Sequence, residues 1–424
     1  MRPDIIFIFS DQQRADTVSP EITPELCKMA EEGAKFSSAY TCQPVCGPAR
    51  ACLQTGVYAT QNGCVTNGIP MDDRGAHLAD LFTAAGYETA YIGKWHLASR
   101  GLEYRDKGVP KKLRGGYEYW LAADLLEFSS NGNGGVLWDG EGNEVRFNGV
   151  RADKMTDLAL EYLKKPKERP VFLFLSFLEP HQQNTSGRFE CPQGYAERFR
   201  DFPVPGDLLG LKGNYRENYA DYLGCCKVLD ENVGKIVRFL KESGRYEKTL
   251  IVYCSDHGCH FMTRNGEYKR SCHQGSVHIP LIFGGGAFED MGDTSRLVSL
   301  IDLPPTLLKA AGIDVPESFS GIALQDKSER DCVFVQISES HNGRCVITDR
   351  YTYSVSSGTN YCPRAYRDDY LYDRKTDEFE RRNLINSPAA AEIKEKLRAL
   401  LAREMIKSGE KAPVFKRRLI KGNI

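Results

Sequence analysis

The 424-residue sequence lacks any long hydrophobic run near its start. The longest apolar stretch there is Ile5-Ile6-Phe7-Ile8-Phe9, whereas a membrane-spanning helix needs about 20 apolar residues. This stretch is also too short for the core of a signal peptide, and no small-residue cleavage site follows it. We therefore expect no membrane span, and a cytoplasmic protein unless a leader has been removed from the chain.

An excess of charge of one sign is also missing. The chain has 56 Lys and Arg against 57 Asp and Glu, a formal net charge of -1. Without a strong overall field, the protein has no general attraction to nucleic acid or to an anionic membrane, so neither is an expected partner. Internal repeats and low-complexity tracts are absent too. Selectivity must therefore come from a local site.

The 14 cysteines show no repeated metal-binding spacing, and two of them, Cys225 and Cys226, are neighbours. In a chain of this length we expect most of them to be reduced thiols in the core. Cysteine usage therefore does not decide the compartment.

Short buried-strand patterns alternate with helical patterns over the first three quarters of the chain. Polar residues follow several of these strands, and open α/β sheets bind ligands at the carboxyl ends of their strands. The pattern predicts an α/β fold with a large, mostly parallel mixed sheet flanked by helices. Strands are expected at 4–10, 89–92, 171–177, 249–254 and 279–284, and helices at 22–33, 76–86, 214–243 and 302–312.

The predicted secondary-structure pattern changes after about residue 325. Four short strand-like runs and a helix at about 387–407 predict a C-terminal subdomain, 326–424, with a four-stranded antiparallel sheet. The α/β domain would then span 1–325. The basic tail at 411–421 is expected to be solvated and partly disordered. The strand-like runs are 332–338, 344–348, 350–355 and 369–373.

Two pairs of metal-binding side chains close two distant strands: Asp11-Gln12 and Asp256-His257. A lone Asp after a strand is more often a cap or turn residue. Hard divalent cations, however, need several oxygen ligands gathered from separate segments. One divalent metal is therefore expected here, with calcium as first choice. Because imidazole suits manganese and other transition ions better, manganese and magnesium stay open as alternatives.

Three further segments carry reactive side chains. The first is Cys46-Gly47-Pro48-Ala49-Arg50, followed by Leu53 and Thr55-Gly56; the second is Gly93-Lys94-Trp95-His96-Leu97; the third is Pro180-His181, with Lys269 thirteen residues beyond Asp256. Taken one at a time, such a cysteine is most often a buried turn residue and such a lysine a solvated one.

Taken together, these segments resemble the sulfatase family of the alkaline-phosphatase-like superfamily. The resemblance rests on the C-x-P-x-R run with Thr-Gly after it, on Gly-Lys-Trp-His, and on the two metal-ligand pairs. It covers most of the chain, and it implies the family's α/β fold and the hydrolysis of sulfate monoesters by an arylsulfatase-like enzyme. Further matching stretches are Gln43-Pro44, 302–306, Leu371-Tyr372-Asp373 and Asn383-Leu384.

The resemblance also implies a modified nucleophile. In this family a maturation enzyme, which would be a partner of this chain, oxidises the motif cysteine to formylglycine. One hydroxyl of the hydrated aldehyde ligates the metal and attacks sulfur, and the other later expels sulfate. Arg50 would hold the charged diol in place. The implied metal ligands are Asp11, Gln12, the modified Cys46, Asp256 and His257.

The remaining roles follow from the same resemblance. Lys94 and Lys269 would bind the sulfate, His96 would act as the base on the formylglycine hydroxyl, and His181 would lie by the leaving-group oxygen. Asn67 stands where a related branch has an active-site asparagine.

The sequence departs from the family pattern at two places. Ala49 replaces the usual serine, which could affect maturation. His273-Gln274 and His278 replace a Glu and an Arg that relatives pair. Losing both charges avoids leaving one of them buried and unpaired, and we favour this interpretation. The alternative is that His273 faces the substrate.

Two other functions stay open. A phosphonate monoester or phosphodiester hydrolase on the same fold has similar metal-ligand pairs, but it tends to carry uncharged hydroxyl side chains where this chain has Lys94 and His96. An inactive relative that only binds a sulfated ligand is disfavoured, because every catalytic position is filled.

The substrate is expected to be a small-molecule or saccharide sulfate ester, and the sequence does not choose among aryl, steroid, sugar and choline-like alcohols. Aromatic side chains at Tyr117, Tyr119, Trp120 and Trp138, and the irregular segment 183–213, are either substrate walls or ordinary structure. No pattern indicates an oligomeric state.

Overall fold

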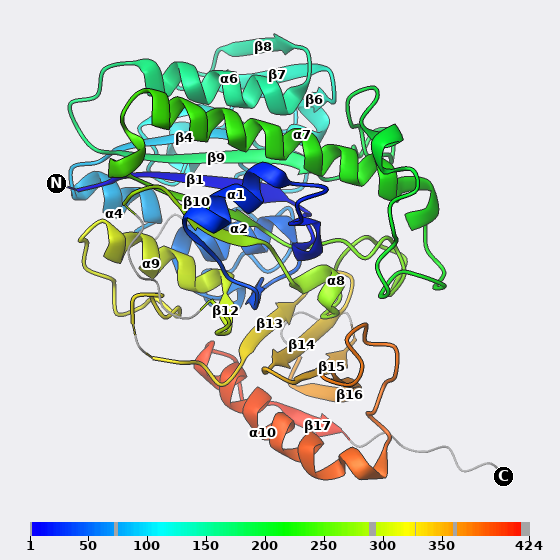
Figure 1. Cartoon of the computed structure of the whole chain (residues 1–424). Coiled ribbons are helices and arrows are strands. Elements are labelled where there is room, and N and C mark those ends of the chain that lie inside the picture. Colours follow the sequence, from blue (N-terminus) through cyan, green and yellow to red (C-terminus); the bar gives the residue numbers. More distant parts are fainter. Residues whose placement is uncertain (1, 72–74, 288–293, 327, 359–362, 417–424) are drawn as a thin grey trace.

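A computed structural model describes residues 2–71, 75–287, 294–326, 328–358 and 363–416. Its larger part is a ten-stranded mixed sheet with helices on both faces, and a smaller sheet with one helix follows at the C-terminal end (Figure 1). The predicted α/β architecture, with a large mixed sheet flanked by helices and a smaller C-terminal sheet, is confirmed. In spatial order the large sheet runs β2 (Ala34–Lys35), β11 (Leu281–Gly284), β10 (Thr249–Ser255), β1 (Asp4–Asp11), β9 (Val171–Pro180), β4 (Glu88–Lys94), β5 (Tyr119–Ala123), β7 (Gly134–Asp139) and β6 (Ser130–Asn131), and β8 (Glu144–Asn148) also pairs with β7.

The five central strands, β10, β1, β9, β4 and β5, are parallel, whereas the outer strands pair antiparallel. The apolar run that opens the chain forms β1, and residues 5–9 are fully buried because both faces of the sheet are covered. Asp4 to Ser10 pair in register with Thr249 to Ser255 of β10. The carboxyl ends of β1 and β10 therefore lie side by side.

Alternate residues of β1 pack into two different cores. Ile6 and Ile8 join one core with helices on one face, while Ile5, Phe7 and Phe9 join the other, as the two-residue period of a strand requires. The first face carries α1 (Pro24–Glu32), α6 (Arg151–Lys164) and α7 (Tyr215–Glu242). The second carries α2 (Cys46–Thr55), α3 (Ala59–Asn62), α4 (Leu78–Ala84) and α9 (Leu303–Ala310).

The C-terminal sheet has one strand more than the four predicted. Strands β13 (Val333–Ile337), β14 (Asn342–Ile347), β15 (Tyr351–Ser357) and β16 (Ala365–Asp373) are antiparallel, with α10 (Ala391–Lys407) packed on them. The fifth strand, β17 (Val414–Lys416), pairs parallel to β16. The prediction of a disordered tail is therefore wrong for 414–416, where the edge of β16 offers backbone hydrogen bonds; 417–421 lies outside the described residues.

The domain division at 325/326 stays a prediction, and it falls in the connection between α9 and β13. Short elements complete the chain: β3 (Ala39–Tyr40) with β12 (Val298–Ser299), α5 (Leu126–Ser129) and α8 (Gln274–Val277).

Among the described residues, no helix is both long and apolar enough to cross a membrane.

The four aromatic residues that could have formed a substrate wall belong to the core. Tyr117, Trp120 and Trp138 are buried in the two clusters that cover the sheet. Tyr119 packs its ring against Tyr162 of α6, with centroids 4.5 Å apart. These side chains stabilise the sheet and do not line the site described below.

Candidate active site

Four side chains with metal-binding atoms converge where β1 and β10 end. They are Asp11 from the end of β1, Cys46 from the first turn of α2, and Asp256 and His257 from the residues after β10. One ligand atom from each lies within 4.8 Å of all the others, and each residue is at most 1% exposed. The sequence prediction that these distant positions meet is confirmed.

The turns that follow β1 and β10 are joined through the side chain of Asp256. Gln12 takes a left-handed conformation with φ of 69°, and its N–H donates to Asp256 Oδ1 at 3.0 Å. The N–H of His257 donates to the same oxygen at 2.8 Å. A single carboxylate therefore links the two turns that follow β1 and β10.

The donor set fits a divalent cation. The side-chain oxygen of buried Gln12 has no hydrogen-bond partner, although its Nε2 donates to Gln182 Oε1 at 2.7 Å. A buried polar atom is rarely left unsatisfied, and a carbonyl oxygen next to two carboxylates is a typical ligand for a hard cation. Asp11, Gln12, Asp256 and His257 are therefore suited to hold a metal ion.

The two aspartates titrate differently. Burial would raise the pKa of the Asp11 carboxyl, but Lys94 and Arg50 hold that pKa below its ordinary range. Burial and the nearby charge of Asp11 raise the pKa of Asp256 to about 6. Two carboxylates this close repel each other, and both ionise only when nearby positive charge offsets the repulsion. A bound cation would supply such charge.

Arg50 lies one turn along α2 from Cys46 and locks the helix to the strand ends. Its Nη2 is 3.0 Å from Asp11 Oδ2 and 3.4 Å from Asp256 Oδ2, and its Nη1 donates to Ser176 Oγ at 2.7 Å. Burial opposes its charge, yet the two carboxylates raise its pKa. The guanidinium therefore stays charged and fixes the start of α2 against the sheet.

Lys94, the last residue of β4, is fully buried between two carboxylates. Its Nζ lies 2.9 Å from Asp11 Oδ2 and 3.2 Å from Glu127 Oε2. Burial would lower the pKa of Lys94, but Asp11 and Glu127 raise it above its usual value. The side chain is therefore a permanent cation on one side of the cluster.

Lys269 reaches residue 46 directly. Its Nζ donates to Cys46 Sγ at 2.8 Å and lies 3.1 Å from His257 Nε2 and 3.2 Å from His181 Nε2. Burial would raise the pKa of the Cys46 thiol, but Lys269 and Lys94 hold it well below its ordinary value. Position 46 is thus built for a negatively charged or strongly nucleophilic atom.

The two predicted catalytic histidines have different neighbours around residue 46. His181 follows β9, and burial together with the charge of Lys269 lowers its pKa below the usual value. His96 takes a left-handed conformation with φ of 62°, and its Nδ1 lies 3.9 Å from Glu127 Oε1. His181 belongs to the cluster around Cys46, and His96 borders it on the Lys94 side.

Two acidic residues of the site escaped the sequence analysis. Glu127 pairs with Lys94, and Lys94 and His96 keep its pKa below the ordinary value in spite of burial. Asp124 accepts the backbone N–H groups of 97, 98 and 99, each at 2.9 Å, and so shapes the loop that carries His96. The one available signal was their position just after a strand, β5, that the sequence pattern had not revealed.

The two residues proposed as substrate contacts are placed differently from the core cluster. Asn67 Oδ1 accepts a hydrogen bond from the Gly47 N–H at 2.9 Å, directly beside Cys46. His273 is buried under the C-terminal sheet, with its ring 4.3 Å from that of Tyr370 and its Nε2 3.3 Å from the Tyr372 hydroxyl. Burial holds the pKa of His273 well below its usual value, which favours the packing interpretation of the His273 substitution.

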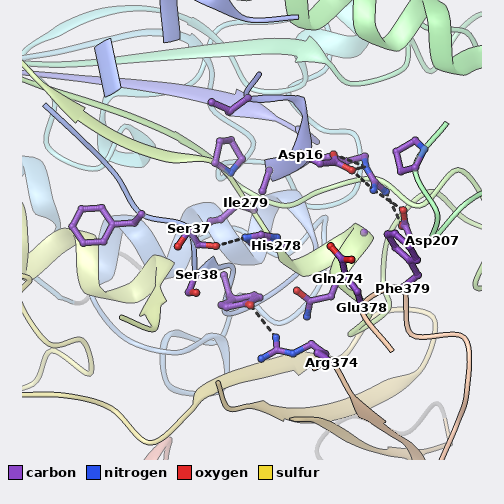
Figure 2. A pocket seen from close by; sticks show the side chains of 18 of the residues that line it. Asp16, Ser37, Ser38, Asp207, Gln274, His278, Ile279, Arg374, Glu378 and Phe379 are labelled. Carbon is purple, nitrogen blue, oxygen red and sulfur yellow. Dashed lines mark hydrogen bonds and ion pairs between the residues drawn. The ribbon is translucent and has the colours of Figure 1, made fainter. Parts of the chain in front are cut away.

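A separate cavity of about 510 Å³ lies beside α8, and none of the residues discussed so far in this site lines it (Figure 2). One of its charged groups, Arg14, is neutralised by two carboxylates: it pairs with Asp16 at 2.6 Å and with Asp207 at 2.8 Å. The Arg374 guanidinium donates to the Tyr40 hydroxyl at 2.9 Å. The cavity therefore lacks the converging reactive groups found at the strand ends.

Comparison with known proteins identifies this arrangement. The sulfatase family model matches residues 3–313, and the model for the C-terminal part of N-sulphoglucosamine sulphohydrolase matches 266–407. The chain belongs to the sulfatase family. It is a sulfuric ester hydrolase of the arylsulfatase-like kind.

The similarity to known sulfatases extends over nearly the whole chain. The sulfatase YidJ of Escherichia coli strain K12 is 30% identical, over 93% of this chain and 86% of its own length. The crystal structure of the putative sulfatase yidJ of Bacteroides fragilis superposes with a TM-score of 0.84 at 25% identity and covers 96% of both chains. A structure of BT4656 in complex with its substrate D-glucosamine-2-N,6-O-disulfate shares the fold, with a TM-score of 0.78 at 22% identity over 97% and 99% of the two chains.

Proposed function

We propose that this sulfatase hydrolyses sulfate monoesters to an alcohol and sulfate, with a formylglycine hydrate derived from Cys46 as its nucleophile. The observation that carries the proposal is the contact of Lys269 with Cys46 Sγ at 2.8 Å, in a site where Lys94 supplies a second buried cation. In this structure the sulfur of Cys46 stands in for the side-chain oxygen of formylglycine.

A divalent cation would be held by Asp11, Gln12, Asp256 and His257, together with residue 46. When bound, it would supply Lewis-acid chemistry by lowering the pKa of an oxygen ligand and stabilising negative charge. We propose calcium, with magnesium and manganese as alternatives, because three of the four side chains offer oxygen and one offers an imidazole nitrogen. Elemental analysis of the purified protein distinguishes the three ions.

The residues of the chain then have separate tasks. Lys94 and Lys269 bind sulfate oxygens and stabilise the charge that develops on them, since buried cations act strongly where water is excluded. Arg50 fixes the position of residue 46 relative to Asp11. The imidazole of His181 lies 3.2 Å from Lys269 Nζ, where it would orient the ester oxygen of the leaving group.

His96 is proposed as the base that takes a proton from residue 46 when sulfate is released. The Glu127 carboxylate, 3.9 Å from His96 Nδ1, stabilises the imidazolium that this proton transfer would create. Glu127 also pairs with Lys94, so a single carboxylate couples the base to one of the sulfate-binding cations.

A sulfated saccharide is the proposed substrate class. The aromatic side chains that could have stacked on a flat aryl or steroid group are committed to the core, and residues next to the cluster, such as Asn67, Gln182 and Arg270, are polar. The complex of BT4656, which shares this fold, with a disulfated glucosamine supports the same choice.

Modification of Cys46 can be measured directly. Trypsin releases residues 36–50 as one peptide that holds Cys42 and Cys46. Conversion of a thiol into an aldehyde replaces sulfur and two hydrogens by oxygen, so we expect this peptide to lose about 18 mass units, with fragment ions that assign the loss to Cys46. Cys42 serves as the internal control. An unmodified Cys46 in protein that still turns over sulfate esters would contradict the proposed nucleophile.

Preference for sulfate over phosphonate separates the proposal from its nearest rival. We expect kcat/KM for an aryl sulfate to exceed that for a phenyl phosphonate ester with the same leaving group by at least about tenfold, a difference of about 1.4 kcal/mol in transition-state binding. Matching the leaving group keeps the comparison on the transferred group. A clear preference for the phosphonate would make the protein a phosphonate monoester hydrolase.

A further inference from the structure

Helix α2 carries the nucleophile, but its own sequence does not cap its amino end. Val45 occupies the N-cap position and has no side-chain oxygen to accept a hydrogen bond. Pro48, in the first turn, has no N–H, and Ala49 N–H bonds to the Val45 carbonyl at 2.9 Å. The N–H of Gly47 is left for a side chain from elsewhere, because the first N–H groups of a helix have no partner within it.

Asn67 provides that partner from twenty residues further along the chain. Its Oδ1 accepts the Gly47 N–H at 2.9 Å. The approach depends on the glycine: a Cβ at position 47 would itself lie only 2.9 Å from Asn67 Oδ1. The cap therefore fixes the residue that directly follows Cys46.

Glu339 fixes Asn67 in turn, and it comes from the other sheet. The residue lies in the turn between β13 and β14, and its Oε2 accepts the Asn67 N–H at 2.6 Å while its Oε1 lies 3.5 Å from Asn67 Nδ2. The Arg270 guanidinium, next in sequence to Lys269, donates to Glu339 Oε1. The turn between β13 and β14 thus reaches the start of α2 through the Glu339 carboxylate.

We infer that Glu339 is a positioning residue for the reaction: through Asn67 it fixes the amino end of α2 and hence the direction of residue 46. The inference rests on the proposed function only in taking residue 46 as the nucleophile. Asp11, Lys269 and His257, which surround residue 46, all belong to the larger part of the chain. The geometry of the nucleophile is therefore set jointly by both parts of the molecule.

The simpler interpretation is that Glu339 only forms an ion pair with Arg270. Glu267 offers a comparison, because its Oε1 lies 3.4 Å from Arg270 Nη1, and within the described residues no hydrogen bond joins it to Asn67. Its Oε1 also accepts the Ser340 hydroxyl at 2.9 Å, and glutamine at position 267 keeps an oxygen for that bond. Glutamine at position 339 separates the two interpretations further. It keeps an oxygen that can accept the Asn67 N–H but loses the charge that pairs with Arg270.

Steady-state kinetics on an aryl sulfate tests the inference, with rates expressed per aldehyde-bearing site. We expect Glu339→Ala to lower kcat by roughly 10- to 100-fold with KM changed less than about threefold, because misplacing a reacting group slows the reaction while the sulfate-binding lysines are intact. Glu339→Gln should recover most of kcat, and Glu267→Gln should match the wild type. The double variant Asn67→Ala/Glu339→Ala should be no slower than Asn67→Ala alone, since the two residues act in series.

Hydrogen exchange gives a readout that does not depend on activity. Peptides that contain Gly47 should exchange faster in Glu339→Ala than in the wild type or in Glu267→Gln, at an unchanged melting temperature. A wild type without sulfatase turnover would refute the proposed function and leave this measurement to judge the positioning contact. The inference is wrong if exchange at Gly47 is unchanged, if kcat of Glu339→Ala stays within about twofold of wild type, or if Glu339→Gln is as slow as Glu339→Ala.

Discussion

Replacing Cys46 with alanine is expected to lower kcat for an aryl sulfate by roughly ten-thousand-fold or more, because removing the nucleophile of a covalent mechanism leaves only binding and electrostatic stabilisation. Lys94 and Lys269 would still bind sulfate in this variant. KM should therefore change much less than kcat. Initial rates over a range of substrate concentrations measure both values.

Cys52→Ala is the matched control for Cys46→Ala. Cys52 lies on the same helix α2 and is fully buried, but it packs in the hydrophobic core and not at the strand ends. We expect this variant to keep substantial activity, with some loss of stability from the smaller side chain. If Cys46→Ala retained as much activity as Cys52→Ala, residue 46 could not be the nucleophile.

Asp256→Asn is expected to remove the bound metal and to lower kcat/KM by roughly a thousandfold, because one ligating carboxylate and its charge are lost. The substitution should leave the fold intact. Asparagine has the same shape, and its Oδ1 can accept the N–H groups of Gln12 and His257 that Asp256 Oδ1 accepts. Asp11 is a poorer choice, since its loss would leave Lys94 and Arg50 buried with too little negative charge.

The metal content of the protein and kcat/KM are the two quantities to measure for Asp256→Asn. Asp230→Asn provides the control: Asp230 is equally buried but lies in the middle of α7, where its Oδ1 accepts the N–H of Leu26 in α1 at 2.8 Å, and asparagine can accept the same bond. Its metal content and rate should equal those of the wild type. A full complement of metal in Asp256→Asn would place the ion elsewhere.

The core of the site could be predicted because its chemistry is written in short local patterns. Asp11-Gln12 and Asp256-His257 each follow a buried apolar run, and the carboxyl ends of adjacent parallel strands meet at one edge of a sheet. The predicted strand at 249–254 differs by a single residue from β10 (Thr249–Ser255), and the predicted helix at 214–243 differs by one residue at each end from α7 (Tyr215–Glu242).

The parts that escaped prediction depend on contacts between distant segments. Nothing near Glu339 signals that its carboxylate reaches Asn67, because the two residues are 272 positions apart. Strand β17 is three residues long and exists only because β16 offers an edge. The aromatic residues around 117–138 could be assigned to the core only once the sheet was in place, since aromatic content alone does not distinguish a packed side chain from a substrate wall.

The burial of Cys46 limits the time available for its proposed oxidation to formylglycine. Only 1% of the residue is exposed once the sheet has closed, and Asp256, which helps to enclose it, is synthesised 210 residues later. At about 5–20 residues per second, a ribosome needs roughly 10–40 s to cover that distance. Under the proposed mechanism, a maturation enzyme would compete with folding of the nascent chain, and we expect the fraction of active molecules in a preparation to depend on which process is faster.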